Sequence, residues 1–208
     1  MTPHLKLGLF LAACAAAHPA IAQQTPQEQS PWLVRLRAVH IAPADKSEPI
    51  GGTGPADLIT VTTRNIAEID VSYFFTPNIA AEVIFGARQK HAMYLGSERV
   101  GSFKHLAPTV LVQYHFRPTA TLRPYLGLGI NHTRISNVDL LGGAGSVEDD
   151  STGPALQAGL DIQLDRNWFL NLDVKKLWIR SDVFVGGARV SHVRVDPTLW
   201  GVGVGYRF

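Results

Sequence analysis

Long apolar runs and cysteine are the features that this sequence most lacks. The single cysteine among its 208 residues is Cys14, so no internal disulfide can form. After residue 22, no apolar run approaches the roughly 20 residues that a membrane-spanning helix requires. Charge is also nearly balanced, with 19 Lys and Arg against 17 Asp and Glu, which gives no sign of a nucleic-acid partner. Membrane residence would therefore require strands that close into a barrel, because lipid cannot satisfy an open sheet edge.

The N-terminal segment has the organisation of a secretory signal. Lys6 supplies a positive charge, an apolar stretch runs from 5 to 17, and Ala20, Ile21 and Ala22 form a small-x-small cleavage site. Cleavage there would remove Cys14 from the mature chain. The run from Leu11 to Cys14 also resembles a lipoprotein signal, an alternative in which Cys14 would carry lipid.

The C-terminal segment alternates strictly between two kinds of residue. Bulky, mostly apolar side chains occupy the even positions, whereas glycine occupies three of the odd ones. The even positions are Thr198, Trp200, Val202, Val204, Tyr206 and Phe208. A period of two predicts a strand with one apolar face, and about ten residues of tilted strand cross a bilayer. The last strand of a soluble β-sandwich is the alternative, but the rest of the chain repeats this pattern.

Eight segments with strand periodicity follow the predicted signal. They lie at 32–40, 63–75, 79–91, 103–116, 123–134, 153–164, 168–180 and 193–208. Short connections at 76–78, 117–122 and 165–167 alternate with long ones at 43–62, 92–102, 135–152 and 181–192. Outer-membrane barrels have short periplasmic turns and longer external loops. We therefore predict an all-β, eight-stranded antiparallel transmembrane barrel, located in the outer membrane of a Gram-negative bacterium, with both termini in the periplasm.

This prediction divides the chain into three parts. They are a cleaved signal (1–22), a short periplasmic tail (23–31) and the barrel (32–208). Aromatic residues should form a girdle against the surrounding outer-membrane lipids, and we assign to it Trp32, Trp168, Trp178 and Trp200.

Tyr206 and Phe208 resemble the terminal signal that the barrel-insertion machinery reads. Lys176 interrupts an apolar face, so it either reaches toward lipid phosphates or is turned inward by a bulge.

The inward-facing positions carry charges of both signs. We predict a polar network formed by Arg35, Arg37, Glu68, Asp70, Glu82, Arg88, Asp161, Asp173, Lys175 and Arg207. An eight-stranded barrel is just wide enough for side chains to fill it, so these charges should pair. The network either only supports the barrel or forms a plug below an apolar external pocket. Ile84 and Leu111 are the candidates for that pocket.

Catalytic, metal and cofactor sites are not predicted. The six histidines that follow the predicted signal show no metal-ligand spacing. Ser191 and His192 are neighbours, but adjacent residues of a strand point to opposite faces, which is poor geometry for a nucleophile and its base. A lipid-modifying enzyme is therefore the less favoured class.

Several ordered motifs resemble those of one family. They are KHLAPT at 104–109, QYHF at 113–116, RPYLGLGIN at 123–131, DRNW at 165–168, VRVDP at 193–197 and GYRF at 205–208. Together they make the chain similar to the OmpW family of small outer-membrane proteins, over nearly the whole mature sequence. The chain departs from this family at 151–154, where Ser-Thr-Gly-Pro stands in place of a bulky aromatic.

The resemblance implies a narrow barrel that passes small, mainly hydrophobic molecules, with exit sideways into the bilayer. We expect such a pore or pocket, small hydrophobic solutes as its partners, and a monomeric protein. The alternative is a receptor or adhesion barrel that binds partners through its external loops and has an inert lumen.

Overall fold

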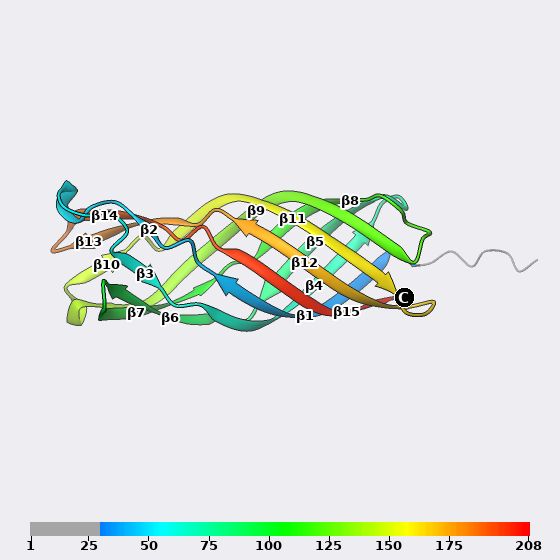
Figure 1. Cartoon of the computed structure of the whole chain (residues 1–208), viewed down its shortest axis with the longest axis horizontal. Coiled ribbons are helices and arrows are strands. Elements are labelled where there is room, and N and C mark those ends of the chain that lie inside the picture. The colour runs from blue at the N-terminus through cyan, green and yellow to red at the C-terminus, as the bar shows by residue number, and fades with distance from the viewer. Residues whose placement is uncertain (1–29) are drawn as a thin grey trace, which may run out of the picture.

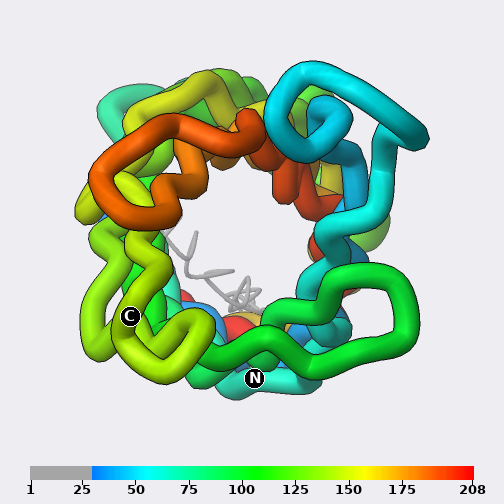
Figure 2. Tube along the Cα trace, turned by 90° about the vertical axis from the view of Figure 1, so that its left-hand side faces the viewer, coloured from blue at the N-terminus to red at the C-terminus, as the bar shows by residue number. Residues whose placement is uncertain are grey.

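The computed structural model describes residues 30–208, so the predicted signal and nearly all of the predicted tail lie outside the described residues. Eight long strands form a closed antiparallel barrel (Figure 1). They are β1 (Trp32–Ala42), β4 (Arg64–Phe74), β5 (Ile79–Gly86), β8 (Thr109–His115), β9 (Leu122–Leu140), β11 (Asp150–Gln163), β12 (Trp168–Leu177) and β15 (Thr198–Arg207). The first and last of these strands pair from Leu33↔Arg207 to Ala42↔Thr198, which closes the ring seen in Figure 2. The predicted fold is confirmed.

The long connections are not irregular loops, which corrects the sequence interpretation. They contribute β2 (Lys46–Ser47), β3 (Ile59–Val61), β6 (Gln89–Leu95), β7 (Glu98–Leu106), β10 (Gly145–Val147), β13 (Arg180–Val185) and β14 (Ala188–Arg194). Two 3₁₀ turns, η1 (Ile50–Gly52) and η2 (Leu141–Gly143), lie among them. These elements continue the barrel wall beyond the eight long strands, and we call this part the extension. The opposite end, with the short connections, is the turn end.

The extension folds because it has an apolar core of its own. That core consists of Ile59, Val61, Met93, Phe103, Ile135, Leu140, Val147, Val183 and Val193. Its wall is completed by side chains, since Val61 N–H donates to Asp45 Oδ1 and Ile59 N–H donates to Ser47 Oγ. No helix in residues 30–208 is long and apolar enough to cross a membrane.

An aromatic girdle surrounds the turn end. Trp32 packs edge-on against Tyr73, with 4.8 Å between ring centroids, and Trp168 packs in the same way against Tyr206 at 5.0 Å. Tyr206 in turn contacts Phe208, which is exposed. Trp200 pairs in register with Val174, well toward the extension, and Trp178 lies beyond the end of β12. The two pairs of tryptophans therefore lie near opposite ends of the long strands, and reading by the insertion machinery stays a prediction.

Lys176 stays on the outer face of the barrel. Its register pairs with Leu156 and Thr198 continue without a shift, so the bulge alternative is wrong. Its ammonium group donates to the carbonyl oxygen of Asp196 on the neighbouring chain segment.

Two inward-facing glycines allow the strands of this narrow barrel to approach closely. A Cβ atom at Gly203 would collide with the carbonyl oxygen of Leu36, and a Cβ atom at Gly129 would collide with the carbonyl oxygen of Val110.

Cysteines placed at the two ends test which way the barrel is inserted. Ala144 is exposed on the extension and Thr119 is exposed in a connection at the turn end. In intact cells, a membrane-impermeant maleimide should label Ala144→Cys strongly. It should label Thr119→Cys only after the outer membrane is permeabilised, with the wild-type chain as background. Labelling of Thr119→Cys alone in intact cells would mean that the extension faces the periplasm.

Candidate functional site

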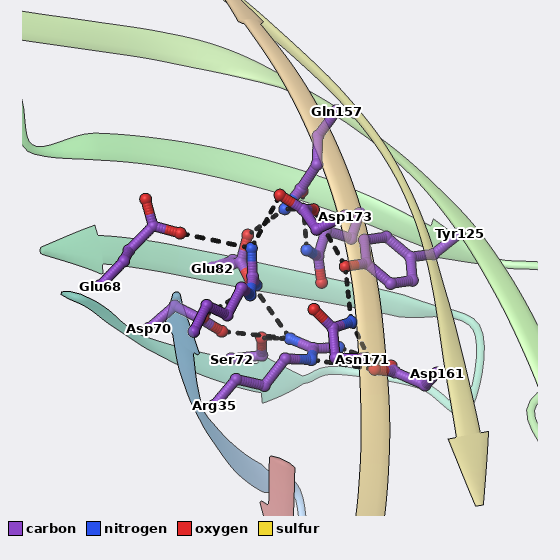
Figure 3. A network of polar contacts seen from close by, with 12 residues as sticks. Arg35, Glu68, Asp70, Ser72, Glu82, Tyr125, Gln157, Asp161, Asn171 and Asp173 are labelled. Atoms are coloured by element: carbon purple, nitrogen blue, oxygen red, sulfur yellow. Dashed lines mark hydrogen bonds and ion pairs between the residues drawn. The ribbon is translucent and has the colours of Figure 1, made fainter. Parts of the chain in front are cut away.

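Arg35 lies at the centre of a buried polar network inside the barrel (Figure 3). Its Nε and Nη2 reach both carboxylate oxygens of Asp161, at 3.1 and 2.7 Å, in a bidentate pair. Nη1 contacts Asp70 Oδ1 at 3.2 Å, Glu82 Oε1 at 3.1 Å and Ser72 Oγ at 2.9 Å. Strands β1, β4, β5 and β11 are therefore tied together through one guanidinium group.

Two further cations extend this network toward the extension. Arg37 contacts Glu82 and Asp70 at 2.8 Å and Asp173 at 3.0 Å. Lys175 Nζ lies 2.6 Å from Glu68 Oε1 and 2.7 Å from Asp173 Oδ1. Three cations thus meet five carboxylates in a space from which solvent is excluded. Neutral polar groups fill the rest of the cross-section, and they are Ser72, Gln113, Tyr125, Gln157 and Asn171.

The structure brings together eight of the ten residues predicted for this network, and it separates two. Arg207 points inward but lies at the turn end, where its Nε donates to Ser30 O and its guanidinium covers the Phe74 ring at 4.1 Å. Arg88 is exposed and belongs to no strand. Its assignment from alternation was wrong because the strand is interrupted there, so the period of two is lost.

Five neutral members of the network were not predicted. Gln157, Asn171, Ser72 and Gln113 share the inward parity of the charged residues, so alternation could have found them. Tyr125 also faces inward, and its hydroxyl donates to Asp173 Oδ2 at 3.1 Å. Alternation along the strand indicates that Tyr125 faces inward, but the residue type alone does not indicate that its hydroxyl joins the charged network.

Ile84 and Leu111 form an apolar floor above the network. Both are buried and belong to one cluster with Val39, Ile41, Ala155, Leu177, Ile179 and Leu199. Ile84 pairs in register with Asp70, so the floor lies directly against the charged groups. These two predicted pocket residues are therefore inward and apolar, but they support the cavities above them and do not line them.

A chain of three cavities lies above this floor; the first two are lined almost wholly by apolar side chains, and the third is lined in part by Glu68 and Lys175 of the network. The first, at the tip of the extension, has a volume of about 260 Å³ and shares Met93 and Val183 with the second. The second, with about 40 Å³, shares His105 and Ile179 with the third, also about 40 Å³. Walls in common mean that the three cavities follow one another from the tip toward the floor.

The third cavity ends at a break in the barrel wall. The β5–β8 ladder stops at Ile84↔Thr109, and the β6–β7 ladder starts at Gln89↔His105. Pro108 lies in the break and has no N–H to donate. Gly86, Ala87 and Ala107 line the cavity there, so only small side chains separate it from the outside of the barrel. The sequence interpretation missed this break because it treated 79–91 and 103–116 as continuous strands.

The inward position near the family's expected aromatic constriction carries a small residue. Ser151 is buried, and its hydroxyl oxygen accepts a hydrogen bond from Arg180 N–H at 2.9 Å. A side chain at Gly153 would collide with the carbonyl of Trp178. At this level two neighbouring segments of the wall approach each other closely, and the inward position is occupied by the small side chain of Ser151 rather than by a bulky ring.

Two histidines line the second cavity. The rings of His91 and His105 lie 4.8 Å apart, and His91 stacks on Phe103 at 5.7 Å. The outer face of β9 is apolar up to Ile130, whereas His105 pairs with Ile135 farther along, so both histidines lie beyond the lipid-facing band. Burial lowers the pKa of His91, and it lowers the pKa of His105 to about 4. Both rings are therefore neutral at pH 7.

Ser191 and His192, the neighbouring residues considered above as a nucleophile and its base, each have a different hydrogen-bond partner. His192 Nδ1 lies 2.6 Å from Asp182 Oδ1, whereas the Ser191 hydroxyl donates to the carbonyl of Glu48, so no histidine activates that serine. No group of three or more His, Cys, Asp or Glu in residues 30–208 is placed to hold a metal ion.

The family model described as "OmpW family" matches residues 28–208. The chain belongs to the OmpW family. It is 37% identical to the uncharacterized outer-membrane protein y4mB of Sinorhizobium fredii, over 97% of this chain and 94% of that protein. It is 30% identical to outer membrane protein W of Vibrio cholerae, over 97% of each. It is 28% identical to the dibenzothiophene metabolism operon protein PahQ of Pseudomonas aeruginosa, over 90% of this chain and 93% of PahQ.

Solved structures agree with this OmpW-family fold. The crystal structure of OprG from Pseudomonas aeruginosa covers 86% of this chain and 97% of its own, with a TM-score of 0.75 and 23% identity. The solution structure of Escherichia coli outer membrane protein W has a TM-score of 0.62 and 27% identity, covering 88% of this chain and all of its own. The chain is an outer-membrane β-barrel of a Gram-negative bacterium, as predicted.

Removal of one network cation tests what holds the barrel together. Arg37→Met leaves Asp70, Glu82 and Asp173 with one buried cation fewer each, and loss of one member of a buried pair costs roughly 3–5 kcal/mol. We expect the urea midpoint of the folded barrel, measured in lipid vesicles, to fall clearly. Arg189→Met is the matched control, because Arg189 pairs with Glu48 and Asp182 on the exposed extension, where pairs contribute about 0–1 kcal/mol. Equal midpoints for both variants would contradict a structural role for the network.

Proposed function

We propose that this OmpW-family protein passes small, mainly hydrophobic molecules from the cell exterior to the outer-membrane interior. The observation that carries the proposal is the chain of three cavities with shared walls, of which the first two are almost wholly apolar. It begins at the tip of the extension and ends where Gly86, Ala87 and Ala107 line the break. A solute that enters at the tip lies among apolar side chains in the first two cavities, and in the third it lies between the small residues of the break and the polar side of the wall, where Glu68 and Lys175 pair with each other.

The buried network supports exit sideways rather than through the turn end. Arg35, Arg37 and their carboxylates fill the lumen below the floor and are bonded to one another. An apolar solute that moved through them would have to separate buried ion pairs, and each unpaired charge is costly. The break instead leads to hydrocarbon, where the solute has its lowest free energy.

The cavities are small, so passage requires side chains to move. A cavity of about 40 Å³ holds only a few water molecules. Met93 lies between the first two cavities, and methionine is flexible enough to adapt to differently shaped ligands. The relative PahQ is named as a protein of a dibenzothiophene metabolism operon, and dibenzothiophene is an apolar aromatic molecule, so we include such molecules in the proposed solute class.

The remaining expectations about the protein extend the same proposal. The eight long strands each pair on both sides and so form a closed ring, and we infer that a monomer is sufficient, surrounded by outer-membrane lipids. Tyr206 and Phe208 are proposed to be read by the insertion machinery. We infer no catalysis, since the relatives compared above are outer-membrane barrel proteins and Ser191 has no histidine partner.

Substitutions at Met93 test whether the cavities carry the solute. Met93→Asp places a charge in the apolar path, and Met93→Trp fills the space. Both should lower whole-cell uptake of a fluorescent aromatic hydrocarbon at least several-fold at equal amounts of folded barrel. Tyr94→Asp, at the adjacent position on the opposite face, should leave uptake near the wild-type rate. Unchanged uptake in both Met93 variants would favour the receptor alternative, with an inert lumen.

A cross-link across the break tests the sideways exit. Ala87 and Ala107 line it from opposite sides, and the described chain has no other cysteine to interfere. The variant with cysteines at both positions, joined by a short reducible cross-linker, should lose most of its uptake and regain it on reduction. Each single-cysteine variant treated in the same way is the control. Full uptake in the cross-linked form would mean that solutes leave by another route.

A further inference from the structure

His91 carries a buried nitrogen that the protein does not satisfy. The side chain is only 2% exposed and lines the second cavity, yet Nε2 has no hydrogen-bond partner within residues 30–208. An unpaired buried polar atom is destabilising, because it has lost its hydrogen bond to water and gained none in the protein. An otherwise apolar cavity therefore contains one polar atom that lacks a partner.

The other ring nitrogen determines what Nε2 can bind. His91 Nδ1 lies 2.8 Å from the carbonyl oxygen of Thr62. A carbonyl oxygen can only accept, so Nδ1 must carry the proton. The ring is neutral at pH 7, because burial lowers its pKa. In a neutral imidazole with its proton on Nδ1, Nε2 is a hydrogen-bond acceptor.

Nearby side chains do not compete for this acceptor. Thr133 donates its hydroxyl to Asn131 Oδ1 at 3.2 Å, and Ser181 donates to the carbonyl of Asp182 at 3.4 Å. The His105 ring lies 4.8 Å from the His91 ring, but no hydrogen bond joins it to Nε2, and the remaining lining is almost wholly apolar, with Phe103, Ile135 and Val183 around the rings. A molecule that fills the cavity and offers one N–H or O–H group would supply the missing donor.

We propose that His91 is a specificity-determining ligand residue, whose Nε2 accepts a hydrogen bond from a solute that is apolar except for one O–H or N–H group. This inference rests on the proposed function and narrows its solute class to molecules such as phenols, indoles and alcohols. Pure hydrocarbons fit the same cavity but leave Nε2 unsatisfied. An ordered water on Nε2 is the competing arrangement, and it would remove the preference.

Two probes of nearly equal shape test this preference. 2-Naphthol offers an O–H donor, whereas 2-methoxynaphthalene has the same ring system and no donor. After subtraction of uptake by cells without the protein, we expect wild-type cells to take up 2-naphthol about tenfold faster, the effect of one hydrogen bond. His91→Phe keeps the stacking on Phe103 and should bring the ratio close to one. His132→Phe changes a histidine that is exposed on the outer face and should leave the ratio unchanged.

A second measurement needs no variant. In ¹⁵N-histidine-labelled wild-type protein in lipid bilayers, the Nε2 resonance of His91 should move on addition of 2-naphthol and stay in place with 2-methoxynaphthalene. Equal uptake of both probes, an unchanged ratio in His91→Phe, or a resonance that ignores 2-naphthol would overturn the role of His91. Uptake of neither probe above background would instead overturn the proposed function itself.

Discussion

The pairing of Arg35 and Arg37 with carboxylates from four other strands, on both sides of the barrel, is the interaction on which the rest of the structure depends. An eight-stranded barrel is too narrow to hold a wide water column and too wide to close on backbone alone. The lumen must therefore be filled, and polar side chains can fill it only if every charge finds a partner. The guanidinium groups provide several donors each, which lets one side chain join strands that are distant in sequence.

This filling divides the molecule into two halves with different chemistry. The half near the turn end is solid and polar inside, and the aromatic girdle holds it in the bilayer. The half near the extension is apolar inside, contains the cavities, and has a wall that is incomplete between Ile84 and Gln89. The position of the floor formed by Ile84 and Leu111 decides where the first half ends. Most of the charges lie below it, and the two that border the third cavity, Glu68 and Lys175, are paired with each other.

Much of the half near the turn end could be predicted from the sequence, whereas little of the half near the extension could be. Alternation identifies β12 and β15 and the inward charges on them, because membrane strands are long and have a strict period of two. It fails at Arg88, where the ladder is broken. It also fails in the extension, where strands such as β3 (Ile59–Val61) are too short to show a period. The role of His91 depends on Thr62, a partner 29 residues away, so local pattern gives no hint that Nδ1 is bonded and Nε2 is free.

The two sides of the barrel also differ in continuity. β9 runs for 19 residues from Leu122 to Leu140 without interruption and belongs to both halves, whereas β5 and β6 are separated at the break. At about 3.3 Å per residue, β9 is roughly 60 Å long along its path, with one irregularity at Asn137, where its register with β7 shifts. Its partner β11 is paired with it from Leu122↔Ile162 to Arg134↔Asp150, which stiffens this side further. The extension is thus continuous with the membrane barrel along β9, whereas on the side of β5 and β8 the two parts are separated by the break. Between Ile84↔Thr109 and Gln89↔His105 the wall has no ladder hydrogen bonds, so under the proposed function the break is the side of the wall where the fewest backbone hydrogen bonds oppose widening.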